Sequence, residues 1–294
     1  MMLPREWLKR IYQLEVKTRL MSQQLLSGNY ASIFLGRGMD FDDVRPYQPG
    51  DDVRRIDWNV TARMRATYVK RFTEEREITF VILVDLSASG QYSTREKSKL
   101  ELAAELAGTL AFSASKSNDR IALLAFTDEV ELYIPPGKGT DHVMHMLRTI
   151  LFHKPKSTGT NLDNALRYLN RVQTRPAMVF LISDFQDQGY ERTLSMTNQQ
   201  HSVAAFVIQD AGEVSLPKAG RMVLHDPETG EQVVVNTSDP KVQRAYAMAV
   251  AEQIETRTRI LRHAGVKHML VDSAESYVSR LAHFLSAELT RKIV

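Results

Sequence analysis

The stretch that most constrains the fold of this chain is residues 78–90, ITFVILVDLSASG. Six of its first seven residues are apolar and leave no polar face, which predicts a central strand of a parallel sheet that is covered on both sides. Asp85, Ser87 and Ser89 follow as Asp-x-Ser-x-Ser on a short turn, at the carboxyl end of the strand where open α/β sheets bind ligands. Three hard oxygen donors in this position suit Mg²⁺ or Mn²⁺ better than zinc or copper.

Strands and helices alternate through the rest of the chain. Apolar runs predict strands at residues 120–126, 177–183, 202–208 and 267–271, and helical spacing predicts helices at 94–118, 141–152, 161–172 and 240–264. An edge strand at 130–134, a β-hairpin at 221–235 and a closing helix at 274–289 complete the pattern. The alternation predicts an α/β fold with a doubly wound, mostly parallel sheet, spanning residues 78–294 as one domain.

Residues 1–77 differ in composition and are expected to form a separate N-terminal region. Residues 4–26 repeat apolar side chains as an amphipathic helix does. Residues 30–77 are dense in Arg and Asp, with prolines and glycines that impose turns and an alternating pattern that predicts a strand at 67–72. Two interpretations of these charges stay open, namely a solvated network of paired side chains, each exposed pair adding ~0–1 kcal/mol, or a docking face.

Composition excludes several function classes. The 38 Lys and Arg nearly balance the 35 Asp and Glu, so the field of the protein gives no reason to expect a nucleic-acid or membrane partner. There is no cysteine, and no apolar run approaches the roughly 18 residues of a membrane span. We therefore expect a soluble, cytoplasmic protein without a membrane span.

A metal site needs more oxygens than the Asp-x-Ser-x-Ser turn provides, since a hard cation takes about six. Thr160 opens a predicted helix, and Asp184 follows the predicted strand at 177–183, so both belong to the sheet edge that carries Asp85. Alone, each residue is also explained by helix capping or by a strand end. Together they predict a site for a divalent cation, preferably Mg²⁺ with Mn²⁺ or Ca²⁺ as alternatives, built from Asp85, Ser87, Ser89, Thr160 and Asp184.

This arrangement resembles the metal-ion-dependent adhesion site of the von Willebrand factor A family, over roughly residues 78–210. The resemblance implies a von Willebrand A-like, Rossmann-like fold in which the two Asp anchor the metal and the Ser and Thr hydroxyls contact it directly or through water. A carboxylate of the protein partner completes the shell in that family. One departure is Phe185, which follows Asp184 where the family commonly has Gly.

A second resemblance lies in residues 47–58, YQPGDDVRRIDW, followed by Ala62 and Arg63. They are similar to the signature of the bacterial domain of unknown function 58 family, in which a von Willebrand A-like module follows. Members are often associated with MoxR-type AAA+ ATPases, and some carry two membrane helices ahead of the signature, which this chain lacks. The resemblance implies a soluble member that acts with such an ATPase.

These observations favour a metal-dependent protein-binding module, an adaptor or co-chaperone whose partner is a protein client or a MoxR-type ATPase, and they assign no catalytic residue. The alternative is a Mg²⁺-dependent phosphoryl-transfer or hydrolytic enzyme with Asp85 as nucleophile, but Ser87 stands where phosphatases need a second acid. Nucleic-acid binding is less favoured, because the interleaved acids repel phosphates. It would use the basic side chains of Arg54, Arg55, Arg63, Arg65, Lys70 and Arg71. The client, the preferred metal, the oligomeric state and the role of residues 30–77 stay open.

Overall fold

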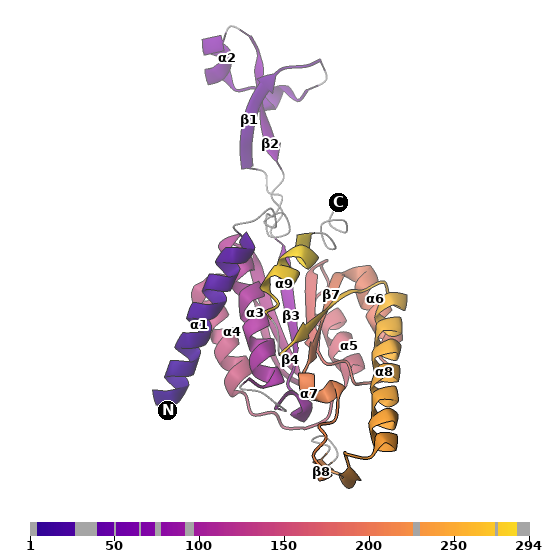
Figure 1. Ribbon diagram of the computed structural model, residues 1–294. Helices are drawn as coiled ribbons and strands as arrows, with labels where there is room; N and C mark the ends of the chain where they lie inside the picture. The colour runs from indigo at the N-terminus through magenta and orange to yellow at the C-terminus, as the bar shows by residue number, and fades with distance from the viewer. Residues whose placement is uncertain are drawn as a thin grey trace. The chain divides into compact units, whose positions relative to one another are not determined.

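The computed structural model describes residues 5–26, 40–49, 51–64, 66–73, 78–91, 97–225, 230–273 and 276–286. The chain divides into two compact units, Met1–Phe34 with Thr79–Val294, and Leu35–Ile78 (Figure 1). The first helix, α1 (Arg5–Leu26), was expected to belong to the N-terminal region of residues 1–77. In the structure it belongs to the larger unit instead. Gly50, residue 94, where a helix is expected to begin, and residues 274–275 and 287–289 of the expected closing helix lie outside the described residues.

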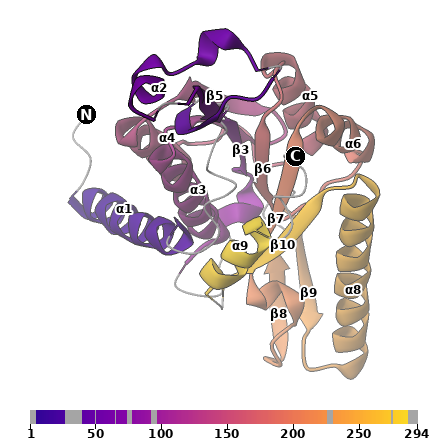
Figure 2. The same cartoon turned by 90° about the horizontal axis from the view of Figure 1, so that it is seen from above.

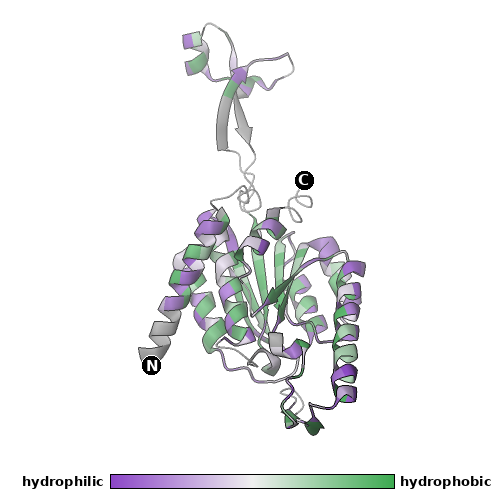
Figure 3. Cartoon of the chain, viewed as in Figure 1, coloured by the Kyte–Doolittle hydropathy of each residue, from purple (hydrophilic) through white to green (hydrophobic). Residues whose placement is uncertain are grey.

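The larger unit is built on a six-stranded sheet with the order β10-β7-β6-β3-β4-β5. Its strands are β3 (Thr79–Asp85), β4 (Arg120–Phe126), β5 (Val130–Gly137), β6 (Met178–Ser183), β7 (Ser202–Gln209) and β10 (Lys267–Asp272). All neighbours are parallel except β4 and β5, which confirms the predicted mostly parallel α/β sheet. Figure 3 shows the central strands of this sheet as mainly hydrophobic, and β3, β4, β6 and β7 are buried along almost their whole length, as expected for strands covered on both faces.

Helices cover both faces of this sheet (Figure 2). One face carries α3 (Lys99–Lys116), α4 (Thr140–Phe152) and α9 (Val278–Phe284), with α1 packed on α3 and α9, and the other carries α5 (Leu162–Val172), α6 (Glu191–Gln200) and α8 (Pro240–His263). Alternate residues of β3 serve the two faces, since Val81 and Leu83 join the core cluster with α5 while Phe80 stacks on Phe180 with ring centroids 5.6 Å apart. Within the described part of the chain, no helix has the length and apolarity to cross a membrane.

The start of α3 differs from the expected helix at residue 94. Ser98 is the N-cap: its hydroxyl accepts from the Glu101 N–H, and the Glu101 carboxylate accepts from the Ser98 N–H. This capping box fixes the helix start because it satisfies N–H groups that have no partner within the helix. Lys99 is therefore the first helical residue.

Short elements complete the larger unit. They are η3 (Ala88–Gln91), α7 (Ala211–Val214) and the predicted hairpin of β8 (Arg221–His225) and β9 (Gln232–Asn236). Three large apolar side chains of this hairpin, Val223, Val233 and Val234, are exposed by 57–70%.

The smaller unit pairs β1 (Asp40–Pro46) with β2 (Tyr68–Thr73) in an antiparallel ribbon, joined through η2 (Val53–Arg55) and α2 (Trp58–Met64). Arg45 donates two hydrogen bonds to the Asp51 carboxylate, at 2.8 and 2.6 Å. Asp57 caps α2 by accepting from the N–H groups of Asn59 and Val60. Charged side chains of the Arg/Asp-rich segment thus pair with each other and with backbone N–H groups inside the unit.

Candidate metal site

The candidate site lies where the order of the strands reverses. After β3 the chain passes to β4 and β5 on one side, and it then returns to β6 on the other side of β3. The register aligns Val84 with Ile182, so that Asp85 and Ser183 end neighbouring strands side by side. The carboxyl end of the sheet at such a switch point is where open α/β folds bind ligands.

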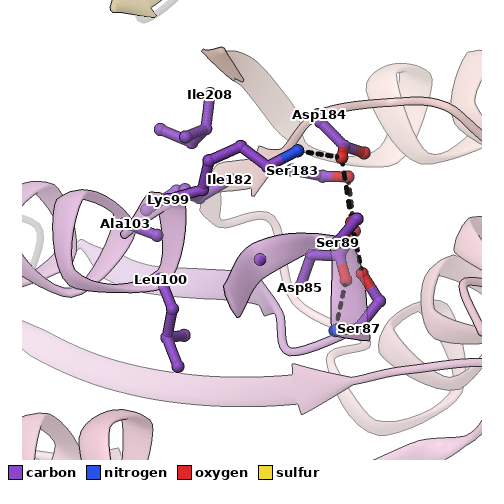
Figure 4. A pocket seen from close by; sticks show the side chains of 11 residues that line it. Asp85, Ser87, Ser89, Lys99, Leu100, Ala103, Ile182, Ser183, Asp184 and Ile208 are labelled. Carbon is purple, nitrogen blue, oxygen red and sulfur yellow. Dashed lines mark hydrogen bonds and ion pairs between the residues drawn. The ribbon is translucent and has the colours of Figure 1, made fainter. Parts of the chain in front are cut away.

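Two hydrogen bonds orient the Asp85 carboxylate. The Ser87 N–H donates to Oδ1 at 2.9 Å, and the Ser183 hydroxyl donates to Oδ2 at 2.7 Å. The short helix η3 then carries Ser89 back toward the turn, so that the hydroxyl oxygens of Ser87 and Ser89 lie 3.0 Å apart. Ser89 in turn donates to Asp184 Oδ2 at 3.0 Å (Figure 4). Four of the five predicted residues therefore lie together.

The spacing of these oxygens fits a small hard cation. Mg²⁺ binds six oxygens at about 2.0–2.1 Å in an octahedron, which places neighbouring ligand oxygens about 3 Å apart. The two spacings of 3.0 Å, from Ser87 to Ser89 and from Ser89 to Asp184, agree with this value. The hollow among these residues has a volume of about 20 Å³, which is room for about one water-sized particle.

The metal-binding groups that line the hollow are the carboxylates of two Asp residues and the hydroxyl groups of Ser residues. Among the described residues, no three His, Cys, Asp or Glu side chains gather as a metal site. A bound cation would therefore depend on the Ser hydroxyls and on further oxygens such as water, which is the pattern of Mg²⁺ rather than of zinc.

Thr160 lies on a loop that adjoins the turn but does not line the hollow. The Ala88 N–H donates to the Thr158 carbonyl at 3.0 Å, which joins this loop to the Asp85 turn. The cap of α5 is Asn161, whose side chain accepts from the Asn164 N–H at 2.9 Å. The structure thus places Thr160 near the other four residues without adding its side chain to the residues that line the hollow.

Phe185 occupies a backbone conformation that favours glycine. Its φ is +58°, in the left-handed region. The side chain is buried and lies beside Tyr190, with ring centroids 6.2 Å apart, and its N–H donates to the Ser183 hydroxyl at 3.0 Å. Phe185 therefore adopts the backbone conformation that glycine would favour at this position. Packing against Tyr190 and the hydrogen bond to Ser183 hold it there.

Lys99 is a residue of the site that the sequence analysis missed. Its ammonium lies 2.8 Å from Asp184 Oδ2 (Figure 4) and 2.6 Å from Glu213 Oε1, and its side chain is only 3% exposed. Arg257 donates to the backbone carbonyl of Asp184 at 3.0 Å. The signal that could have found Lys99 is the pair Ser98 and Glu101, because this capping box places Lys99 at the start of a helix beside the site.

Comparison with known proteins assigns the chain to a family. Residues 43–256 match the family described as Protein of unknown function DUF58. The chain belongs to this DUF58 family. Uncharacterized proteins of Mycobacterium bovis and Mycobacterium tuberculosis are 31% identical over 282 residues, which cover 95% of this chain and 88% of theirs. The uncharacterized protein YeaD of Bacillus subtilis is 28% identical over 105 residues, 36% of this chain and 24% of that protein.

Solved structures are more distant. The conserved hypothetical protein BatB from Bacteroides thetaiotaomicron matches with a TM-score of 0.47 and 16% identity, covering 71% of this chain and 97% of that one. An aerotolerance-related membrane protein from Bacteroides fragilis matches with a TM-score of 0.46 and 15% identity, covering 73% and 99%. These similarities are too distant to transfer a function to this DUF58 protein.

Burial is the largest single influence on the pKa values of Asp85 and Lys99 in this DUF58 protein. Burial raises the pKa of Asp85, and the negative charge of Asp184 raises it further. Hydrogen bonds from Ser183 and Ser87 lower it in part, and the resulting pKa of Asp85 is about 7. Burial lowers the pKa of Lys99, but the charges of Asp184 and Glu213 outweigh this and leave it raised. The site thus stabilises an ammonium while it disfavours a second carboxylate charge.

Proposed function

We propose that this chain is a metal-dependent protein-binding module with a von Willebrand A-like fold. Asp85, Ser87, Ser89 and Asp184 would hold a divalent cation, preferably Mg²⁺ with Mn²⁺ or Ca²⁺ as alternatives, and Thr160 would contribute from its adjoining loop. The observation that carries the proposal is the convergence of four oxygen-bearing side chains at the switch point of the sheet, with spacings of 3.0 Å among the oxygens of Ser87, Ser89 and Asp184.

The chain's own residues have distinct tasks in this proposal. A bound cation would supply a coordination position for a carboxylate of the partner. Asp85 and Asp184 supply the negative charge, and Ser87 holds Asp85 in place through its N–H. Ser89 is partly exposed, whereas Asp85, Ser87 and Asp184 are 8%, 1% and 6% exposed. The partner would therefore approach from the side of Ser89.

We further propose that the module acts in the cytoplasm as an adaptor or co-chaperone with a MoxR-type AAA+ ATPase, as the family resemblance implies. The exposed valines of the β8–β9 hairpin support a protein partner, because exposed apolar patches often mark interaction sites. This hairpin follows α7 in the chain, and α7 carries the Glu213 that pairs with Lys99.

The enzyme alternative gains no support from the contacts of Asp85. Both of its carboxylate oxygens accept hydrogen bonds, from Ser87 and Ser183, and the residue is 8% exposed. A nucleophile has to present an oxygen to its substrate. The low exposure of Asp85 limits access by a substrate, whereas a small cation can use the lone pairs that the two hydrogen bonds leave free.

Thermal unfolding with Mg²⁺, Mn²⁺ and Ca²⁺ tests the metal site. For the wild type, metal at about 100 times its dissociation constant should stabilise the folded state by about 2.7 kcal/mol. Asp85→Ala should lose this effect, whereas Asp141→Ala should keep it. Asp141 is exposed at the start of α4, which follows β5 at the edge of the sheet opposite to the one that carries Asp85. Equal stabilisation of wild type and Asp85→Ala, or none in either, would contradict the proposal.

Partner binding needs its own measurement. Purified MoxR-type ATPase from the same cell should bind the immobilised chain in Mg²⁺ and dissociate in EDTA. Binding of equal strength with and without EDTA would remove the metal from the mechanism.

A further inference from the structure

Lys99 brings a positive charge into a site that is otherwise suited to a metal ion. The ammonium reaches the hollow from the first residue of α3, and its side chain is 3% exposed. Leu100, Ala103 and Ile208 also line this hollow, and Figure 4 shows the Lys99 side chain extending from α3 toward Asp184. A lysine that is this deeply buried needs anionic partners, because transfer of an unpaired ammonium out of water is strongly unfavourable.

Asp184 is the point where the ammonium and a metal ion would meet. The same oxygen, Oδ2, accepts from Ser89 at 3.0 Å and from Lys99 at 2.8 Å. A cation that is coordinated by Ser89 and Asp184 would lie within roughly 5 Å of the ammonium, a separation at which like charges repel strongly inside a protein. The two cations therefore compete for one carboxylate.

Glu213 gives the ammonium a second acceptor. Its Oε1 accepts from Lys99 at 2.6 Å, while its Oε2 accepts from the Asp210 N–H at 3.1 Å in the capping box of α7. This capping box holds Glu213 in position independently of Lys99. Lys99 can thus give up its bond to Asp184 and keep the bond to Glu213.

We propose that Lys99 is a tethered cation that competes with the divalent metal for Asp184, an inference that rests on the proposed metal-binding function. Metal entry displaces the ammonium from Asp184 and leaves it on Glu213. Lys99 thereby lowers the affinity of the site for metal. It also favours divalent over monovalent ions, because a single positive charge gains no electrostatic advantage over the ammonium that it replaces.

Calorimetric titration of Mg²⁺ into metal-stripped protein tests the proposal with a series at one position. Lys99→Met and Lys99→Gln remove the charge, and each should bind Mg²⁺ about tenfold more tightly than the wild type or better. Lys99→Arg keeps the charge and should stay close to the wild type. Lys97→Met is the matched control, because Lys97 pairs with Glu105 at 2.7 Å and does not line the hollow, so its affinity should stay within about twofold of the wild type.

The outcomes separate this inference from the proposed function. If wild type binds Mg²⁺, Asp85→Ala does not, and the two neutral Lys99 variants bind no more tightly than Lys97→Met, the inference is wrong and the metal site stands. If neither wild type nor the neutral variants bind, both are wrong. Binding that appears only in the neutral variants supports the competition by Lys99 and contradicts metal binding by the wild type. Circular dichroism verifies folding, and Lys99→Gln, whose amide can still donate to Asp184 and Glu213, carries the test if Lys99→Met does not fold.

Discussion

Replacing Asp85 by asparagine should stabilise the metal-stripped protein, and the gain should grow with pH. The substitution keeps the shape of the side chain and removes its charge. Asp85 ionises in the folded state at a pKa of about 7, because burial and the neighbouring Asp184 oppose its charge. The amide side chain of the Asp85→Asn variant carries no such penalty at any pH.

The direction and the magnitude of this stabilisation follow from the linkage between folding and proton binding. In the unfolded chain the carboxyl loses its proton near its ordinary pKa of 3.8, whereas in the folded state it keeps the proton up to about 7. Between these values the folded state binds more protons, so the wild-type free energy of unfolding falls as pH rises and levels off above about 7. The full difference corresponds to about 4 kcal/mol. Roughly a third of it is already lost at pH 5, so the advantage of the Asp85→Asn variant should grow by about 2–3 kcal/mol between pH 5 and pH 8.

Urea denaturation in EDTA, followed by circular dichroism from pH 5 to pH 8, measures this difference. Asp141→Asn, which changes an exposed carboxylate at the start of α4, is the control and should differ from wild type by a constant amount. Adding Mg²⁺ should narrow the gap between Asp85→Asn and wild type, since the metal favours the ionised carboxylate. A gap in EDTA that stays constant over this pH range would refute the assignment of Asp85 as a destabilised buried charge.

Three further predictions concern the site and its supports. Phe185→Gly should be more stable than Phe185→Ala by about 1 kcal/mol in urea denaturation, because only glycine adopts φ of +58° without strain; the opposite order would mean that the turn relaxes. Glu105→Gln should destabilise the larger unit by about 1–3 kcal/mol and speed hydrogen exchange in α1, because Glu105 accepts from Lys17 at 2.5 Å and Lys97 at 2.7 Å; unchanged exchange would show that apolar packing alone holds α1. Mg²⁺ affinity should rise about tenfold per pH unit up to about pH 7 and then level off, because the metal binds ionised Asp85; a profile equally steep in Asp85→Asn would assign the proton elsewhere.

Local patterns in the sequence were sufficient to predict the sheet. The strands of a parallel sheet are apolar throughout because both faces are buried, so β3 and β6 stand out without any knowledge of their neighbours. The ends of parallel strands meet at one edge, which is why the ends of these two strands predicted that Asp85 and Asp184 lie together. α6 was missed because its sequence is mostly polar, so it lacks the apolar stripe that identifies a helix.

Contacts between distant segments were beyond local patterns. Lys99 and Glu213 meet although 114 residues separate them, and a lysine on a helix is usually an exposed residue. The helix start was placed too early because Thr94 is also a capping residue type, and only the pairing of Ser98 with Glu101 distinguishes the true cap. Thr160 is the opposite case to Lys99. The sequence predicted it as a site residue on a loop beside Asp85, but its side chain is not among those that line the hollow.

Charge balance connects the unusual pKa of Asp85 with the buried Lys99. Burial and the charge of Asp184, which follows β6, both oppose ionisation of Asp85 at the end of β3, and a protein without metal has two ways to relieve this. A proton can bind to Asp85, or a cation can bind to Asp184, and the structure provides for both, through the raised pKa of one and the ammonium of the other. A divalent cation replaces both at once, because its two charges equal those of one proton and one ammonium.

Loading the site with a divalent cation should therefore release a proton from Asp85 and displace Lys99 toward Glu213. For the same reason Asp85→Asn, which removes a negative charge, and Lys99→Met, which removes a positive one, should change the affinity for metal in opposite directions.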